Sequence, residues 1–212
     1  MNVTIFGANS SIGKHLIDIF IKNDHKVTAF VNKPGSIKVP PPNLKIIVGH
    51  IYDNKIVKNA IQDADVIINT FKPEFKILKN TGYYVNNISN KTIIEEMISL
   101  DKKRFITLSR LTDNKNTGNI NPFLSIFFNK ILYKSYKEEF KSTRELLEKS
   151  NLDWTILRII RTAPSRKKDY AIYKENNKIG SFVSNYNIAR FLYDISVDNS
   201  FVRELPIISN TK

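Results

Sequence analysis

The first thirteen residues hold the spacing in this chain that most clearly points to chemistry. Gly7 and Gly13 bracket a short turn with the sequence Gly-Ala-Asn-Ser-Ser-Ile-Gly. Glycine at the first position permits a sharp turn, and glycine at the last lets a helix pack closely against a strand. The middle position, usually a glycine that lets phosphate approach the backbone, is Ser10. The first N–H groups of a helix attract a pyrophosphate, so the turn predicts a dinucleotide site contacted by Gly7, Asn9, Ser10, Ser11, Ile12 and Gly13.

The segment after the second expected strand should select the coenzyme. That strand ends at Val31, and NAD-selective sites place an acidic residue near this point to hold the ribose 2′-hydroxyl. Here the chain continues Asn32-Lys33-Pro34, with no acid and with an available cation. We therefore expect NADP(H) to be favoured over NAD(H), with Lys33 facing a 2′-phosphate. The alternative is that Lys33 is an ordinary loop lysine and Asn32 alone contacts the ribose.

Two further strand ends should line the same site. His50 and Ile51 follow the third strand, where an adenine ring would rest, although His50 could equally be a plain loop residue. Asp53 is placed to cap the next helix. Thr70 and Phe71 follow the fourth strand and are the expected contacts with the ribose and pyrophosphate.

The candidates for catalysis are few. Ser109 ends the fifth expected strand beside the predicted nicotinamide position, and could hydrogen-bond a carbonyl group or simply satisfy the loop backbone. Arg110 could meet an acidic substrate or face solvent. Tyr133 and Lys137 have the spacing of a Tyr-x-x-x-Lys pair, in which lysine lowers the phenol pKa for proton donation. In a chain rich in lysine and tyrosine this spacing also arises by chance.

Strands and helices alternate along the chain. Short apolar runs predict strands at 3–6, 26–31, 44–48, 66–69, 105–108, 154–157 and 205–208. Helical patterns cover 12–22, 55–61, 86–100, 123–149 and 187–195. Alternation of this kind predicts an α/β fold of the doubly wound Rossmann type, a three-layer sandwich with a mostly parallel sheet in the order 3-2-1-4-5-6. Residues 1–212 should form a single domain, with 205–208 as an added edge strand and a substrate-side excursion at about 159–182.

Composition narrows the classes of function. With 33 basic and 20 acidic residues the net charge is +13, yet the lysines are dispersed and no nucleic-acid module appears, so nucleic acid is an unlikely partner. Without cysteine, and with only three scattered histidines, no metal site is expected. No apolar run is long enough to span a membrane and no signal peptide is apparent, which predicts a cytoplasmic protein.

From the turn onward, the chain resembles the atypical short-chain dehydrogenase/reductases that bind NAD(P)H. These include the NmrA-like proteins, the NADH-flavin reductases and biliverdin reductase B. The likeness spans nearly the whole chain through ordered segments at residues 3–13, 25–34, 48–53, 63–68, 104–109, 152–158 and 183–189. The family pattern differs at Asn9 and Ser10, which replace Thr and Gly, and at Asn32, which replaces an arginine. His50 replaces an aspartate, and Ile159 replaces a proline.

The resemblance implies a reductase that uses NAD(P)H, and it locates the family's lysine at Lys141 and its tyrosine position at Lys137, which argues against Tyr133. A serine like Ser109 occurs at this point across these reductases. The leading hypothesis is an NADPH-dependent oxidoreductase acting on a small acceptor such as a flavin, a quinone or another planar molecule. The alternative is a non-catalytic dinucleotide-binding redox sensor or interaction module. The sequence favours no oligomeric state.

Overall fold

The protein, described from a computed structural model for residues 1–35, 41–71, 85–111, 136–164, 169–173 and 182–211, is built on an eight-stranded sheet. The strand order is β3-β2-β1-β4-β5-β6-β10-β8. The strands are β1 (Asn2–Phe6), β2 (Lys26–Val31), β3 (Leu44–Val48), β4 (Val66–Asn69), β5 (Arg104–Arg110), β6 (Asp153–Ile159), β8 (Tyr170–Tyr173) and β10 (Ile207–Asn210). A separate two-stranded pair joins β7 (Thr162–Ala163) to β9 (Val183–Ser184).

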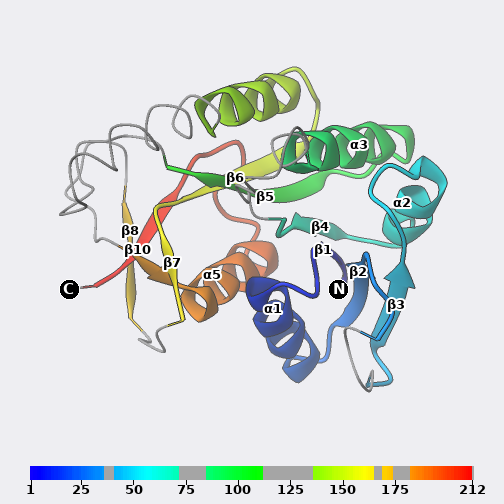
Figure 1. The fold of residues 1–212 in the computed structure, drawn as a ribbon, viewed down its shortest axis with the longest axis horizontal. Coiled ribbons are helices and arrows are strands. Elements are labelled where there is room, and N and C mark those ends of the chain that lie inside the picture. Colours follow the sequence, from blue (N-terminus) through cyan, green and yellow to red (C-terminus); the bar gives the residue numbers. More distant parts are fainter. Residues whose placement is uncertain (36–40, 72–84, 112–135, 165–168, 174–181, 212) are drawn as a thin grey trace.

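Helices cover both faces of the sheet and give three layers (Figure 1). On one face lie α1 (Ser11–Lys22) and α5 (Asn185–Val197), whose apolar residues share a core with Ile5, Ile68 and Ile106. On the other lie α2 (Asn54–Ile61), α3 (Val85–Ser99) and a helix over residues 136–148. Because both faces are covered, side chains on both faces of the central strands are buried rather than alternating with exposed ones.

The expected strand order 3-2-1-4-5-6 is confirmed, and all neighbouring strands in it pair in parallel. Val3, Ile5, Ile67 and Ile106 are buried in the central strands, as expected. Parallel strands end at one edge, so the carboxyl ends of β1, β2, β4 and β5 lie together. That shared edge is where the glycine turn and Ser109 both sit.

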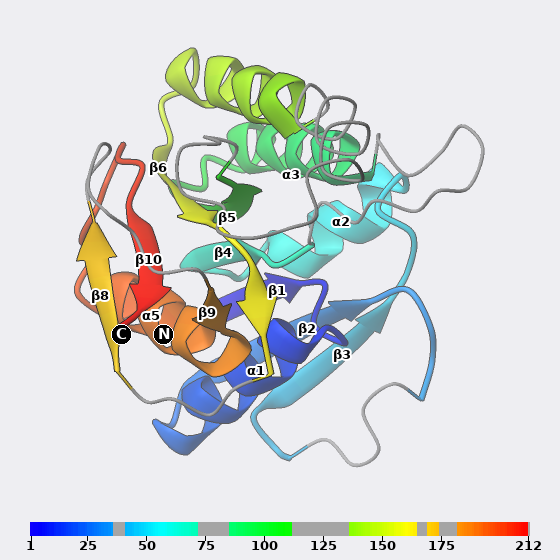
Figure 2. The same cartoon turned by 60° about the vertical axis from the view of Figure 1, so that its left-hand side comes forward.

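The expected edge strand at 205–208 is wrong in position and in role. The strand is β10, Ile207–Asn210, which pairs in parallel with β6 on one side. Its other side is covered by β8, which runs antiparallel to it and forms the sheet edge (Figure 2). Glu204 forms an isolated parallel bridge with Thr155, and continuous pairing begins at Ile207, after Pro206, which has no N–H to contribute to a ladder. β8 belongs to the 159–182 stretch, whose weak periodicity gave no strand signal.

A buried hydrogen-bond network joins α3 and the 136–148 helix to the sheet. Asn69 at the end of β4 donates through Nδ2 to Ser89 Oγ and Asn90 Oδ1. Asn90 also accepts from Thr107 Oγ1 on β5 and donates to Thr143 Oγ1. All five side chains are buried. Polar groups in such a position cost free energy unless bonded, so these bonds fix how the two helices sit on the sheet.

Arg104, the first residue of β5, connects the amino ends of two strands to the end of α5. Its guanidinium donates to the carbonyls of Asp153, Ile195 and Ser200 and to Thr155 Oγ1. Burial lowers the pKa of Arg104 to about 10, and Asp153 and Asp198 offset part of this effect. The group therefore stays charged at neutral pH and holds four acceptors at once.

We expect Arg104→Met to lower the free energy of unfolding by roughly 3 kcal/mol, since it leaves buried carbonyls without a donor. Arg144→Met is the matched control, because Arg144 is exposed and its pair with Glu148 contributes little. Urea unfolding followed by circular dichroism measures both. An equal, small loss in the two variants would contradict the assigned role of Arg104.

Candidate functional site

The turn between β1 and α1 is as tightly closed as its glycines suggested. Gly7 has φ +70°, a conformation that favours glycine, and a Cβ there would lie 2.9 Å from Thr70 Oγ1. A Cβ on Gly13 would lie 2.6 Å from the Gly7 carbonyl oxygen and 2.7 Å from Ala8 Cα. The atoms that such a Cβ would meet belong to the backbone or to the short Thr70 side chain, so they cannot move away easily. The turn thus brings the start of α1 against the end of β1, and its backbone fits the pyrophosphate of a dinucleotide.

Ser10 caps α1 at the place where glycine was expected. Its Oγ accepts from the Gly13 N–H at 3.0 Å and lies 3.3 Å from Thr70 Oγ1. Thr70 directs its own hydrogen to the carbonyl oxygens of Phe6 and Gly7, at 2.8 and 3.0 Å. Ser10 is therefore the donor toward Thr70. The Ser10 hydroxyl thus accepts one hydrogen bond and donates another. The Gly13 N–H that it engages is one of the helix donors that a phosphate would otherwise use.

The end of β2 lies beside this turn. Asn9 Nδ2 donates to Asn32 Oδ1 at 3.3 Å, which joins two of the residues expected to contact the coenzyme. Asn32 and Lys33 are both exposed. A ligand crossing from the turn to the end of β2 would meet Asn9, Asn32 and Lys33 in that order.

The other expected contacts divide into surface and core. His50 and Ser11 are exposed, whereas Ile12 and Ile51 have buried side chains that pack in the two apolar cores. Thr70 is buried under the turn, and Phe71, partly buried, bonds through its N–H to Asn69 Oδ1. Asp53 caps α2 through bonds from Lys55 N and Ile56 N, as expected.

Ser109 has a buried partner that the sequence analysis missed. Its Oγ donates to Glu139 Oε2 at 3.3 Å, and the two side chains are only 1% and 4% exposed. Glu139 lies on the 136–148 helix, on the inward stripe that also contains Thr143 and Leu147. Glu139 precedes Thr143 and Leu147 by four and eight residues, the spacing of one helix face. This spacing was the sequence signal that could have identified it. The pair lies at the carboxyl ends of the parallel strands, as does the glycine turn.

Arg110 and Arg158 are neighbours of Ser109 in the sheet, one along β5 and the other across to β6. Arg158 is opposite Ser109 in the β5–β6 register, is buried, and has its guanidinium carbon 4.6 Å from the centre of the Phe140 ring. Arg110 ends β5 and contacts Tyr136. Tyr133 lies outside the described residues. Lys137 and Lys141 are both exposed, and Lys141 pairs with Glu145.

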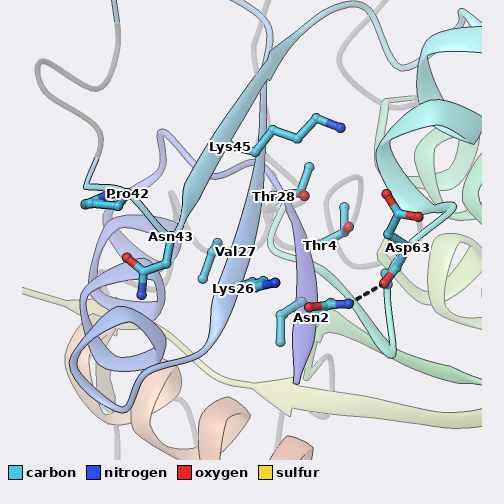
Figure 3. A pocket seen from close by; sticks show the side chains of 11 residues that line it. Asn2, Thr4, Lys26, Val27, Thr28, Pro42, Asn43, Lys45 and Asp63 are labelled. Atoms are coloured by element: carbon cyan, nitrogen blue, oxygen red, sulfur yellow. Dashed lines mark hydrogen bonds between the residues drawn. The ribbon is translucent and has the colours of Figure 1, made fainter.

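A hollow of about 520 Å³ opens at the opposite ends of the same strands (Figure 3). Lys26, Thr28 and Lys45 lie on its β2 and β3 side, and Asp63 lies across from them. Thr4 also lines it, but its hydroxyl is committed to the Ala60 carbonyl. The hollow lies where α2 leaves the sheet face open, away from the glycine turn. It is not part of the coenzyme site.

The described residues contain neither a metal-ligating cluster nor a membrane-spanning helix. No group of three histidine, aspartate or glutamate side chains there gathers as a metal ion would require. No helix in the same part of the chain is long and apolar enough to cross a membrane.

Comparison with known proteins agrees with this architecture. A family model described as NAD(P)H-binding matches residues 7–199, so the chain belongs to that family of Rossmann-fold proteins. No curated protein matches the sequence significantly. Among solved structures, a Rossmann-fold NAD(P)-binding family protein from Shigella flexneri is 25% identical, with TM-score 0.74, over 99% of this chain and 93% of its own.

Two other solved structures share the fold at lower identity. A short-chain dehydrogenase/reductase from Veillonella parvula, in complex with NADP, is 20% identical over 99% of this chain and 94% of its own, with TM-score 0.76. ChuY, an anaerobillin reductase from Escherichia coli O157:H7, is 16% identical over 100% and 98%, with TM-score 0.77.

Ser10→Gly should tighten coenzyme binding while changing stability by only a few tenths of a kcal/mol, since glycine is a tolerable N-cap. The change frees the Gly13 N–H and removes a side chain from the phosphate side of the turn. Isothermal titration with NADPH measures the affinity, and thermal unfolding measures the stability. Weaker binding by Ser10→Gly would mean that the hydroxyl itself is a phosphate ligand.

Proposed function

We propose that this protein is an NADPH-dependent reductase of a flavin, a quinone or a similar planar acceptor. The proposal is carried by one juxtaposition: the glycine turn and the Ser109–Glu139 pair occupy the same carboxyl edge of the sheet. In doubly wound folds the coenzyme crosses this edge. A coenzyme whose pyrophosphate lies on α1 would extend its nicotinamide toward β4 and β5, and hence toward Ser109.

When bound, the reduced nicotinamide supplies a hydride, which the acceptor takes up together with a proton from water. Ser109 directs its hydroxyl hydrogen to Glu139, so its oxygen lone pairs are available to an N–H group such as the nicotinamide carboxamide. Burial of the pair keeps this geometry fixed. Its role in the proposed site is therefore to orient the nicotinamide, and no side-chain proton donor is required.

Two comparisons support the proposal. The Veillonella parvula reductase, which shares the fold, is in complex with NADP, and the E. coli structure with the same fold is a reductase. In this chain the exposed Lys33 follows β2, and no acid stands between Val31 and Gly35. We infer that Lys33 faces the 2′-phosphate and that NADPH is preferred.

A non-catalytic redox sensor is the second candidate function. It is favoured by Ser10, whose hydroxyl occupies the helix donor of Gly13, and by Lys137, an exposed lysine at the family's tyrosine position. Such a protein would bind reduced and oxidised coenzyme with different affinities and turn neither over.

Steady-state NADPH oxidation with riboflavin, FMN and quinones tests the reductase. We expect turnover above the blank, and a loss of roughly tenfold in kcat/KM for Ser109→Ala, because one orienting hydrogen bond is worth about 1.4 kcal/mol. Ser99→Ala, at the exposed end of α3, should have no effect. Coenzyme binding without turnover of any acceptor would contradict the reductase. Different calorimetric affinities for NADPH and NADP+ would then support the sensor.

Coenzyme choice is tested by Lys33→Glu. We expect the unmodified protein to bind NADPH roughly ten- to a hundredfold more tightly than NADH, since a charge-assisted contact stabilises by about 1.5–3 kcal/mol. Lys33→Glu should abolish or invert that preference, and rising salt should reduce it. Lys45→Glu, at the opposite end of the sheet, is the matched control. Equal affinity of the unmodified protein for both coenzymes at low salt would remove Lys33 from the site.

A further inference from the structure

Arg110 is held in a fixed position at the edge that carries the proposed site. Its Nε donates to the Ile160 carbonyl at 3.2 Å, and a terminal nitrogen donates to the Tyr136 hydroxyl at 3.1 Å. The guanidinium carbon also lies 5.3 Å from the centre of the Tyr136 ring. Strand β5, the segment after β6 and the start of the 136–148 helix thus all fix one side chain. Holding a long arginine side chain in one rotamer costs conformational entropy, which these contacts offset.

The charge of Arg110 is not neutralised within the described part of the chain. Its contacts there are a carbonyl, a phenol hydroxyl and an aromatic face, and none is a carboxylate. The contrast with Arg144 is direct, since that exposed arginine bonds Glu148 at 2.7 Å. Arg110 is half-buried, and two of its five N–H groups are used in these bonds. The remaining donors suit a carboxylate or phosphate group.

The position of Arg110 relates it to the acceptor rather than to the coenzyme phosphates. It follows Ser109 directly on β5, while the phosphate-binding turn lies at β1, two strands away in the sheet order. Arg158, buried behind the same edge and opposite Ser109, adds positive charge. Glu139 is the described carboxylate at this point, and it accepts the Ser109 hydroxyl.

We propose that Arg110 forms an oxyanion subsite of the acceptor site, so that the acceptor carries a carboxylate or phosphate group. This inference rests on the proposed function, because it names the chemical class of the substrate. Tyr136 is a positioning residue in it, since its hydroxyl and ring orient the guanidinium. The subsite would make the enzyme discriminate between acceptors that differ only in their charged group.

Equilibrium binding to the NADP+-saturated protein tests the subsite separately from turnover. The first matched pair is riboflavin and FMN, which differ by a phosphate, followed by flavin fluorescence. The second is 2-(hydroxymethyl)anthraquinone and anthraquinone-2-carboxylate, followed by absorbance. We expect the anionic member of at least one pair to bind roughly ten- to a hundredfold more tightly. The pair that responds identifies phosphate or carboxylate as the group recognised.

Arg110→Gln should remove that discrimination while leaving the affinity for NADP+ and for the neutral member within twofold. Tyr136→Phe should reduce the discrimination only partly, because it removes the hydroxyl and keeps the ring. Arg161→Gln, an exposed charge near the same edge, is the control for general attraction and should change it less than twofold. Neither anionic member binding more tightly, or an equal effect of Arg110→Gln and Arg161→Gln, would overturn the proposal. So would a loss of NADP+ affinity in Arg110→Gln.

This outcome is distinguishable from failure of the proposed function. If discrimination is present and depends on Arg110 but NADPH oxidation is absent, the protein binds an anionic planar ligand without reducing it, and the subsite stands. If turnover is present with neutral and anionic acceptors alike, the reductase stands and the subsite is wrong.

Discussion

The structure depends on how closely α1 approaches the end of β1. The space between the Gly13 α-carbon and the Gly7 carbonyl cannot admit a methyl group, so the helix and the strand are fixed in direct backbone contact. Thr70 extends the constraint to β4, because its hydroxyl is bonded to the carbonyls of Phe6 and Gly7 at the start of the turn. With these three segments joined, the helix N-terminus has to face the carboxyl edge of the sheet. The remaining strand ends then supply the walls of one site.

Local sequence patterns were sufficient to predict most of the elements and, through their alternation, the doubly wound order of the first six strands. The order of the first six strands, the capping of α2 by Asp53 and the closure of the turn all follow from glycine spacing, apolar runs and helix-capping chemistry. The pairing of β10 with β8 was missed because β8 has only four residues and lies in a stretch whose weak periodicity gave no strand signal. Glu139 was missed for a different reason. Its spacing with Thr143 and Leu147 indicates one helix face, but that this face packs on the sheet and that its carboxylate meets Ser109 depend on tertiary packing.

Three arginines in this structure differ in what compensates the burial of their charge. Arg104 is surrounded by carbonyl oxygens, which supply partial negative charge without a formal ion pair. Arg158 lies over the face of Phe140, where the ring quadrupole is attractive to a cation. Arg110 combines a carbonyl, a hydroxyl and a ring and keeps part of its surface in solvent.

The hydrogen bonds of Asn90 have a consequence for how the site could change over evolutionary time. Apolar side chains such as Ile93 and Met97 tolerate small rotations of α3, but the bonds from Asn69 and Thr107 and the bond to Thr143 are satisfied at one rotation. The same network sets the angular phase of the 136–148 helix, which presents Tyr136 and Glu139. Residues at the entrance of the site can therefore be substituted one at a time while α3 and the 136–148 helix stay in place. A substitution at Asn90 would instead displace several functional side chains together. Changes in specificity should therefore arise from residues at the entrance of the site and not from Asn90.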